Sequence, residues 1–361
     1  MFLPEEITPV RSGLADDVAS LGRVAVRAPL EWGEPDYAVV RVHYGTDRTP
    51  SAPDPLPGFG PGRGELVYGR CDVSIPRDHR MGDLESPSIW RLEFREDPAR
   101  HVVVLDVTAQ TRAEFMGELA TRAQRARQAL LFVHGYNVAF TDAVRRTAQL
   151  AYDLGASGPP MCFSWPSQGS VPGYTVDEAN IEWAERDLVT FLMTVLEVAT
   201  VERLYVLGHS MGTRGVTRAL MRLLAGHPAL ATRVREVILA APDIDRDVFL
   251  RDVAPALHAV GMPVTLYASS RDKALAASRT VHGTARAGDV DGGVVVAPGV
   301  ETIDASAVET GFLGHSYFAE EKSLIGDITE LLHHGSRASS RRRLEAVNAG
   351  AAGQFWRFRE G

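Results

Sequence analysis

Cysteine is scarce in this chain, which has only two among its 361 residues. Cys162 lies within an apolar, strand-like run, where a small buried residue is a better interpretation than a disulfide partner or a metal ligand. This cysteine usage fits a reducing compartment.

Long apolar runs and an excess of positive charge are also absent. No uncharged apolar run approaches the ~18 residues that a membrane span requires. Residues 1–19 show neither the basic nor the apolar region of a signal peptide. The net charge of −8 argues against a nucleic-acid partner, because binding to phosphates needs clustered positive charge. We therefore expect a cytoplasmic protein without integral membrane association and without a nucleic-acid partner, and the sequence leaves the oligomeric state open.

The pattern of the chain changes near residue 108. Before that point, strand-like segments follow one another with little helix between them, at 37–45, 66–75, 90–94 and 101–107. From Thr108 onward, strands and helices alternate, beginning with a helix that Thr108 or Thr111 can cap. Such alternation predicts a mostly parallel sheet with helices on both faces.

The same change of pattern suggests how the chain is organised. We expect one domain over residues 1–335, in which a strand-rich extension at 37–107 precedes an α/β core at 108–335. Whether the early strands extend the sheet or cover it stays open. The tail at 336–361 contains three consecutive arginines from Arg341 and a late aromatic group, Phe355-Trp356-Arg357-Phe358. It predicts a solvated basic turn with an aromatic anchor that folds back on the body.

Apolar runs in the second part predict strands that are buried on both faces. Between these runs, apolar residues recur at helical spacing and predict helices. Strands are expected at 130–133, 161–165, 204–207, 237–240, 264–268 and within 294–306. Helices are expected at about 142–154, 178–198, 211–224, 246–260 and 322–333.

One strand-to-helix junction contains a candidate nucleophile. The pentapeptide Gly208-His209-Ser210-Met211-Gly212 lies between the apolar run at 204–207 and the helical pattern that follows. A serine at such a corner occupies a strained turn, and its hydroxyl projects above the carboxyl ends of the strands. The pentapeptide alone is weak evidence, because a glycine-rich connection can produce it by chance. Its place between strand and helix makes Ser210 the predicted nucleophile.

A serine hydroxyl needs an oxyanion hole and a base to react quickly. The strand at 130–133 ends in His134-Gly135-Tyr136-Asn137, at the edge of the sheet where an oxyanion loop belongs. The predicted donors are the backbone N–H groups of Tyr136 and Met211. Alone, the His-Gly pair would be explained as an ordinary turn out of a strand.

Six histidines follow Ser210, and His315 is the preferred base. It lies in a glycine-containing loop after the last expected strand of the core, where the base of a nucleophile-elbow enzyme belongs. His282 follows a short helical piece and remains an alternative. The others lie in or at the ends of predicted helices, where histidine is ordinary: His227, His258, His333 and His334.

The acid that orients the base should lie between Ser210 and His315 in the chain. Asp272 follows the second strand after the serine, at 264–268, and is the preferred candidate. Asp243 follows the nearer strand, at 237–240, and is the alternative acid. Asp245 has an adequate explanation as a helix cap.

Further motifs accompany these residues over roughly 37–335: Tyr44-Gly45-Thr46-Asp47-Arg48, Phe163-Ser164-Trp165-Pro166-Ser167, Ala241-Pro242-Asp243-Ile244-Asp245 and Gly314-His315-Ser316-Tyr317. In this combination the chain resembles a bacterial branch of the α/β-hydrolase superfamily, the esterase-like family known as domain of unknown function nine hundred. The resemblance implies the α/β-hydrolase fold, serine-hydrolase chemistry with the chain order Ser, Asp, His, and no need for a metal or a cofactor. It does not imply a natural substrate.

The expected reaction is hydrolysis of a small-molecule carboxylic ester through a Ser210-His315-Asp272 triad. His134, Asn137, Trp165 and His209 are expected to line the pocket. The same machinery could serve a thioesterase, an amidase or a peptidase, and a non-catalytic binding protein with this fold is the rival from another class. The acyl-chain length of the ester is not specified by the sequence.

Overall fold

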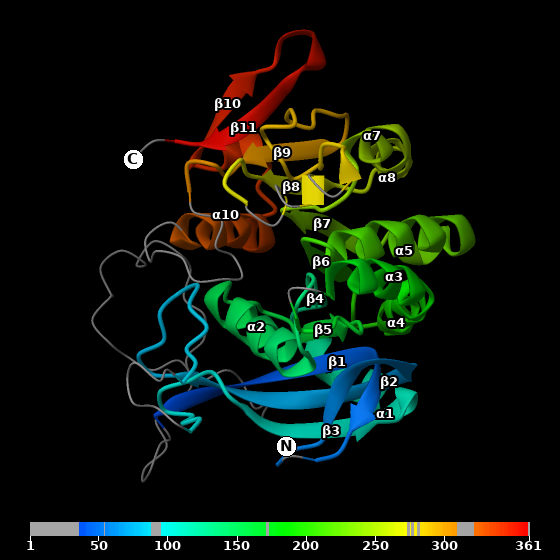
Figure 1. Cartoon of the computed structure of the whole chain (residues 1–361), viewed down its shortest axis with the longest axis vertical. Helices are drawn as coiled ribbons and strands as arrows, with labels where there is room; N and C mark the ends of the chain where they lie inside the picture. The colour runs from blue at the N-terminus through cyan, green and yellow to red at the C-terminus, as the bar shows by residue number, and fades with distance from the viewer. Residues whose placement is uncertain are drawn as a thin grey trace.

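One sheet of 11 strands runs through the molecule (Figure 1). The computed structural model describes residues 36–53, 55–87, 95–170, 173–272, 275, 278, 279, 282–308 and 321–359. In their order across the sheet, the strands are β10 (Leu344–Asn348), β11 (Gln354–Phe358), β9 (Val300–Asp304), β8 (Val264–Ala268), β7 (Val234–Ala240), β6 (Arg203–His209), β4 (Gln128–Val133), β5 (Pro160–Ser164), β1 (Tyr37–Ser51), β2 (Gly58–Pro76) and β3 (Val104–Gln110).

The sheet is mostly parallel, as predicted. Every neighbouring pair from β11 to β1 is parallel, whereas β2 and β3 at one end and β10 at the other are antiparallel to their neighbours. The early strands therefore extend the sheet and do not cover it. Each expected strand of the core coincides with an observed one, and the segment 294–306 contains β9. The strand expected at 90–94 lies outside the described residues.

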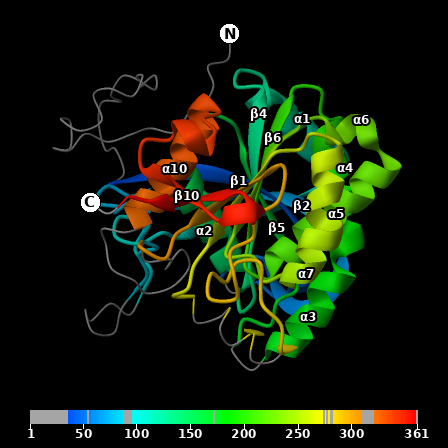
Figure 2. The ribbon, with the colours of Figure 1, turned by 90° about the horizontal axis from the view of Figure 1, so that it is seen from above.

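Alternate side chains of the central strands point to two apolar layers. Leu131 and Val133 pack on one face of β4, and Leu130 and Phe132 pack on the other. The first face is covered by α1 (Arg112–Ala123), α3 (Tyr174–Trp183), α4 (Glu185–Glu197), α5 (Gly212–Gly226) and α8 (Ala254–Ala259). The opposite face is covered by α2 (Phe140–Asp153) and α10 (Glu321–His334), and Figure 2 shows the two layers on either side of the strands.

Several helix ends follow the predicted chemistry. Thr111 caps α1 in a capping box with Glu114, and Asp245 accepts the first N–H groups of α7 (Arg246–Val248). Two helices differ from expectation. The helix predicted at 178–198 is divided into α3 and α4 at Ala184, and the helix predicted at 246–260 contains a π-helical turn, η3 (Phe249–Val253), between α7 and α8. The remaining short elements are α6 (Pro228–Ala231), η4 (Ala338–Ser340) and η5 (Gly350–Ala352).

The C-terminal tail joins the sheet through the hairpin of β10 and β11. The prediction of a solvated basic turn is wrong for Arg341, whose side chain is fully buried between Asp327 at 2.6 Å and Glu301 at 2.9 Å. Three adjacent arginines suggested solvent exposure because their partners lie far away in the sequence. The aromatic anchor is confirmed, since Phe358 is buried and Trp356 packs on the same apolar layer.

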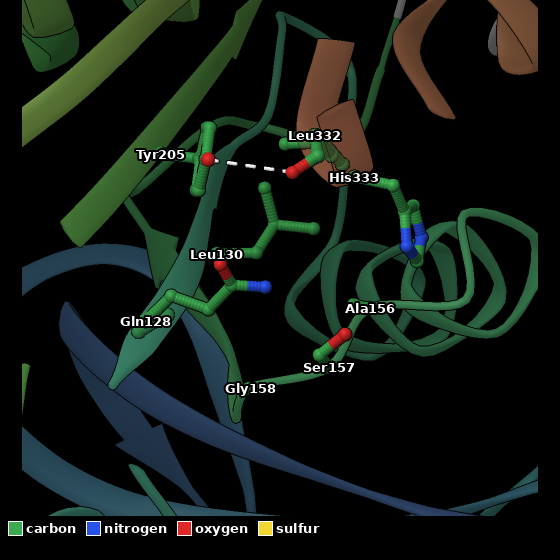
Figure 3. Close-up of a pocket in the computed structure, with 9 residues that line it drawn as sticks. Gln128, Leu130, Ala156, Ser157, Gly158, Tyr205, Leu332 and His333 are labelled. Carbon is green, nitrogen blue, oxygen red and sulfur yellow. Dashed lines mark hydrogen bonds between the residues drawn. The ribbon is translucent and has the colours of Figure 1, made fainter. Parts of the chain in front are cut away.

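Both cysteines are free and buried, as expected for Cys162. In the described part of the chain, no helix has the length and apolar character to cross a membrane. A cavity of about 10 Å³ lies near the amino ends of the central strands. Figure 3 shows residues that line it, among them Gln128, Tyr205 and His333. That volume is about what one water needs, so the cavity is no candidate for a substrate.

Candidate active site

Ser210 occupies the turn between β6 and α5 in a left-handed conformation, with φ at 47°. A non-glycine residue adopts this conformation only where its surroundings impose it. Backbone hydrogen bonds hold the turn: Ser210 N–H donates to Ala240 O, at the end of β7, at 2.9 Å, and Ser210 O accepts from Thr213 N–H at 3.0 Å. The strand, turn and helix predicted around Ser210 are confirmed, and the serine sits at the carboxyl end of β6.

Two glycines allow the loop at residues 134–138 to approach this turn. A Cβ atom on Gly135 would lie 3.0 Å from Ser210 Cβ, and one on Gly212 would lie 2.2 Å from His134 O. At Gly212 the neighbour is backbone, which cannot yield, so only hydrogen fits there, whereas at Gly135 a Cβ atom would crowd the side chains of Ser210 and His209. The loop and the start of α5 therefore touch directly, and the backbones of Tyr136 and Met211, the predicted oxyanion donors, come from these two touching segments.

His134, the first residue of the loop, packs against Trp165. Their rings stack with centroids 4.9 Å apart, and Trp165 Nε1 donates to His134 O at 2.8 Å. His134 Nδ1 lies 2.7 Å from Gly135 O, and burial together with the nearby Arg48 charge holds the pKa of His134 well below its usual range. Both side chains are almost completely buried, so they present little surface to a substrate, in contrast to their expected place in the pocket lining.

The two other residues expected in the pocket lining lie at the turn and on the loop. Asn137 is exposed and has a positive φ of 58°. His209 is partly exposed, and its Nδ1 atom would lie 2.8 Å from a Cβ atom on Gly135. Both therefore border the junction of the loop with the serine turn.

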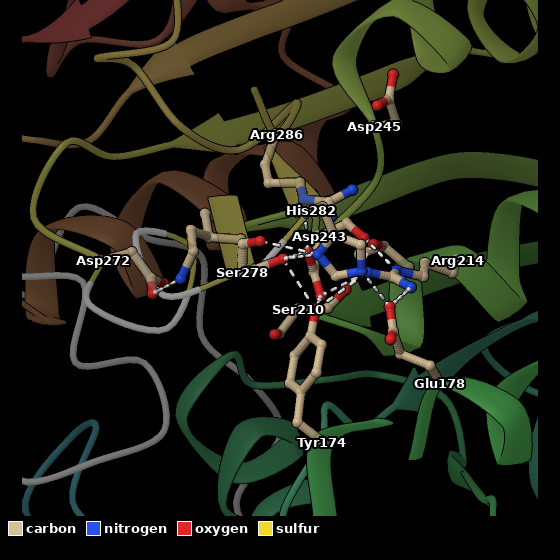
Figure 4. Close-up of polar contacts among 12 residues, drawn as sticks. Tyr174, Glu178, Ser210, Arg214, Asp243, Asp245, Asp272, Ser278, His282 and Arg286 are labelled. Carbon is tan, nitrogen blue, oxygen red and sulfur yellow. Dashed lines mark hydrogen bonds and ion pairs between the residues drawn. The ribbon is translucent and has the colours of Figure 1, made fainter. Parts of the chain in front are cut away.

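Asp243, the alternative acid, is buried beside Ser210. Its backbone N–H donates to Ser210 O at 3.4 Å. Its carboxylate accepts from Tyr174 Oη at 2.6 Å, Ser278 Oγ at 2.6 Å and Arg214 at 3.0 Å, and Arg286 lies 3.4 Å away (Figure 4). Three hydrogen bonds and a further cation occupy both carboxylate oxygens, which leaves little acceptor capacity for an imidazole.

His282, the alternative base, belongs to the same cluster. Its Nε2 atom lies 2.6 Å from Glu178 and its Nδ1 atom 2.8 Å from Ser278 O, so both ring nitrogens are engaged (Figure 4). Glu178 also binds Arg214 at 2.6 Å. Burial raises the pKa of Glu178, but Arg214 and His282 together outweigh burial, so the pKa is lowered overall.

Asp272, the preferred acid, lies four residues beyond the end of β8. Its Oδ1 atom accepts the N–H of Leu275 at 3.0 Å, and Leu275 and Ser278 are helical. Asp272 therefore occupies a capping position at the amino end of this helical segment. In Figure 4, Asp272 lies apart from the cluster around Asp243. The preferred base, His315, lies outside the described residues.

The segment that carries Asp272 is tied to the segment that follows β9. Ala305 N–H donates to Ala268 O at 2.7 Å, and Ser270 N–H donates to Ser306 Oγ at 2.8 Å. The residues just before Asp272 therefore lie beside the stretch that leads from β9 toward position 315.

Sequence reasoning missed four side chains that hold this region together: Arg48, Tyr174, Asp177 and Arg214. Arg214 follows Ser210 by one helical turn, and Tyr174 and Asp177 lie on α3, so their polar side chains could be seen in the sequence but not their burial. Among the described residues, no three metal-binding side chains come together.

Comparisons with known proteins identify a family. Residues 108–334, more than half of the chain, match the family model described as "Alpha/beta hydrolase of unknown function (DUF900)". No curated protein matches the chain.

Solved structures give weaker likenesses. A predicted CIB-like hydrolase from Thermoplasma acidophilum is 15% identical with a TM-score of 0.32, over 58% of this chain and 87% of that one. A lipase-esterase related protein from Clostridium acetobutylicum is 13% identical with a TM-score of 0.34, over 56% and 94%. Esterase 2 of Thermogutta terrifontis, phosphorylated by paraoxon, is 12% identical with a TM-score of 0.34, over 57% and 82%. Scores this low carry no information about activity.

Proposed function

Because the chain belongs to the family of alpha/beta hydrolases of unknown function that matches residues 108–334, we propose that it is a serine hydrolase that cleaves carboxylic esters of small molecules. The observation that carries this proposal is the conformation of Ser210. Its φ of 47° and the close approach of Gly135 to its Cβ atom are what a nucleophile elbow facing an oxyanion loop requires.

In the first half of the reaction, Ser210 Oγ attacks the carbonyl carbon of the ester while His315 takes the proton from Oγ. The carbonyl oxygen becomes an oxyanion, which accepts hydrogen bonds from the N–H groups of Tyr136 and Met211. The C–O bond to the alcohol then breaks, and His315 returns the proton to the departing alcohol oxygen. An acyl group remains attached to Ser210.

In the second half, water replaces the alcohol. His315 takes a proton from the water as its oxygen attacks the acyl carbon, and the same two N–H groups stabilise the second oxyanion. When the bond to Ser210 Oγ breaks, the proton returns to the serine and the carboxylic acid leaves. The steps named here use only groups of the protein, the substrate and water.

Asp272 is the acid of this proposal. Its role is to accept a hydrogen bond from His315 Nδ1, which fixes the imidazole tautomer and stabilises the imidazolium. Two observations support this choice over Asp243. The residues before Asp272 are bonded to Ala305 and Ser306, ahead of position 315, whereas the carboxylate of Asp243 is already occupied by three hydrogen bonds.

A fluorophosphonate probe and a panel of activated esters of graded acyl length test the proposal. Wild type should be labelled on the peptide that contains Ser210 and should hydrolyse at least part of the panel, and EDTA should leave the rate unchanged. Ser210→Ala should lose the label and on the order of 10⁶-fold in kcat, with an unchanged circular dichroism spectrum. Labelling at another serine, or full activity of Ser210→Ala, would refute the nucleophile. Turnover of thioesters or amides alone would refute the ester substrate.

A further inference from the structure

Buried polar side chains from outside the loop hold residues 134–138, the predicted oxyanion loop. Asn137 N–H donates to the Asp177 carboxylate at 3.1 Å, and Val138 N–H donates to Ser167 Oγ at 3.1 Å. Ser167 Oγ in turn donates to the Asp177 carboxylate at 2.5 Å. Asp177 belongs to α3, and its other oxygen accepts Gln168 N–H at 2.7 Å. One carboxylate thus ties the loop to the segment that follows β5.

Arg48 holds the loop from the end of β1. Its Nε donates to Ser164 Oγ at 2.9 Å, one terminal nitrogen to Ser167 O at 3.0 Å and the other to Val138 O at 2.7 Å. Longer contacts of 3.4 Å reach Gly60 O and His134 Nε2. All five N–H groups of the guanidinium therefore face an acceptor. The two ends of the loop, His134 and Val138, meet the same side chain.

Burying the charges of Arg48 and Asp177 costs free energy. Arg48 is 1% exposed and Asp177 is fully buried. Burial lowers the pKa of Arg48 to about 10, which leaves its guanidinium charged at neutral pH. Its hydrogen-bond acceptors are backbone carbonyls, a hydroxyl and an imidazole, so no carboxylate bonded to it offsets the desolvation directly. A neutral apolar residue of similar size would cost less to bury, so stability alone does not account for an arginine here.

We propose that Arg48 and Asp177 are positioning residues of the oxyanion hole, which fix the backbone of residues 134–138 so that Tyr136 N–H is directed at the developing oxyanion. The inference rests on the serine-hydrolase function proposed above. The N–H groups of Asn137 and Val138, directly after Tyr136, are directed to Asp177 and Ser167, which fixes the backbone of the loop at these two residues. An oxyanion hole acts through donors that are already in place before the reaction.

The expected effect follows from that geometry. Removing an oxyanion donor lowers kcat by about 10²- to 10³-fold, and a misplacement of about 1 Å can cost about 10²-fold. Arg48→Met should therefore lower kcat about 100-fold, and Asp177→Asn by a similar factor. Ser167→Ala removes only the hydroxyl between Asp177 and Val138, so about 10-fold is expected. KM should change by less than about threefold, because the loss concerns the transition state.

The experiment compares these variants with matched controls on the ester that wild type hydrolyses best. Ser74→Ala removes an equally buried hydroxyl on β2, where Ser74 Oγ donates to His101 O at 3.1 Å and Ser74 pairs with Val39, far from the loop along β1. Arg341→Met removes an equally buried guanidinium in the C-terminal tail. Each protein is measured for kcat, KM, melting temperature and affinity for a trifluoromethyl ketone, which forms an oxyanion when Ser210 adds to it.

The positioning role predicts that Arg48→Met, Asp177→Asn and Ser167→Ala lose kcat and ketone affinity in the same proportion, while both controls lose neither. If Arg48→Met fails to fold, Asp177→Asn and Ser167→Ala carry the test. An active wild type whose Ser167→Ala and Asp177→Asn variants match the controls in kcat and ketone affinity would overturn the positioning role and leave the proposed function standing. A wild type that neither hydrolyses esters nor binds the ketone would overturn both.

Discussion

Two groups of buried charged side chains lie at opposite edges of the same parallel sheet. The carboxyl-edge network consists of Tyr174, Glu178, Arg214, Asp243 and Ser278 and lies beside Ser210 (Figure 4). The amino-edge network consists of Glu236, Thr265, Glu301, Asp327, Arg337 and Arg341 and lies near the first residues of β7, β8 and β9. Both pair arginines with carboxylates, of which Asp243, Glu236 and Asp327 are buried.

The two networks differ in the part of the chain that their charged side chains fix in place. In the carboxyl-edge network, Arg214 donates to the carbonyl of Asp243, whose N–H meets Ser210 O, so the charges fix the backbone of the serine turn. In the amino-edge network, Arg341 joins Asp327 of α10 to Glu301 of β9 and fixes the tail to the body. Burial and pairing are alike in the two, so they do not identify a functional site. The position in the fold distinguishes the two networks, because ligands of such folds bind at the carboxyl ends of the parallel strands.

The largest effect is expected at the acid of the proposed triad. Asp272→Asn should lower kcat on the order of 10⁴-fold, because the histidine then adopts the wrong tautomer. Asp243→Asn should act mainly on stability, since it breaks the carboxyl-edge network, leaves Arg286 without the carboxylate and leaves Arg214 with Glu178 alone. Kinetics with a good ester and thermal unfolding of both variants measure the two effects. With both variants folded by circular dichroism, the reverse order of kcat would make Asp243 the triad acid.

The parts of the molecule that depend on local sequence could be predicted from it. The apolar run of β6, the glycines around Ser210 and the cap at Asp245 lie within a few residues of what they determine. They therefore leave a pattern that a single sequence displays.

The supports of the site could not be predicted in this way. Arg48 meets Val138 from 90 residues away, and Asp177 meets Asn137 from 40. The burial of Arg341 depends on partners 14 and 40 residues away, so the three arginines had the local pattern of a solvated turn. The break between α3 and α4 has no glycine or proline to mark it. Tertiary packing decides these features, and local propensity does not contain it.

In the amino-edge network, Arg341→Met should lower stability without lowering catalysis. Breaking a buried ion pair by removing one partner costs about 3–5 kcal/mol, because Asp327 remains buried without its cation, whereas Glu301 keeps Arg337. Urea unfolding measures the loss, and active-site titration with the fluorophosphonate gives kcat per labelled molecule. If kcat per labelled molecule fell as well, the amino-edge network would affect catalysis in addition to stability, and the two networks would not differ in function.

A buried carboxylate without a partner gives a contrast with both networks. Asp47 is fully buried, and neither of its carboxylate oxygens has a hydrogen-bond partner in the described part of the chain. Burial, with the Asp187 charge second, raises its pKa to about 8. Since the folded pKa exceeds that of the unfolded chain, stability is present at low pH and is lost as pH rises toward 8.

Asp47→Asn should remove that loss. Between pH 5 and pH 7 the free energy of unfolding of wild type, relative to Asp47→Asn, should fall by about 3 kcal/mol, at about 1.4 kcal/mol per pH unit. Urea unfolding of both proteins at the two pH values gives the difference. A difference that does not change with pH would mean that Asp47 is ionised and solvated in the folded protein.

The smallest effect is expected at His43, a buried base on the same strand. Its side chain is fully buried, its ring lies edge-on to Phe115 with centroids 5.8 Å apart, and neither ring nitrogen has a hydrogen-bond partner among the described residues. The groups that face it are Glu118, which favours the charged form, and Arg122, Arg41 and Arg70, which oppose it. Burial dominates and lowers the pKa of His43 to about 4.

His43 should therefore make the protein sensitive to acid, in the opposite direction to Asp47. Below about pH 6.5 the unfolded chain binds a proton that the folded protein excludes, so stability falls as pH falls toward 4. From pH 6.5 to pH 5, wild type should lose about 2 kcal/mol relative to His43→Leu, which cannot bind that proton. Urea unfolding of the two proteins at both pH values measures this difference. If the stability of His43→Leu depended on acid pH in the same way as that of wild type, the imidazole would already gain a proton or a partner in the folded state. The contrast between this buried group and the paired networks would then fail.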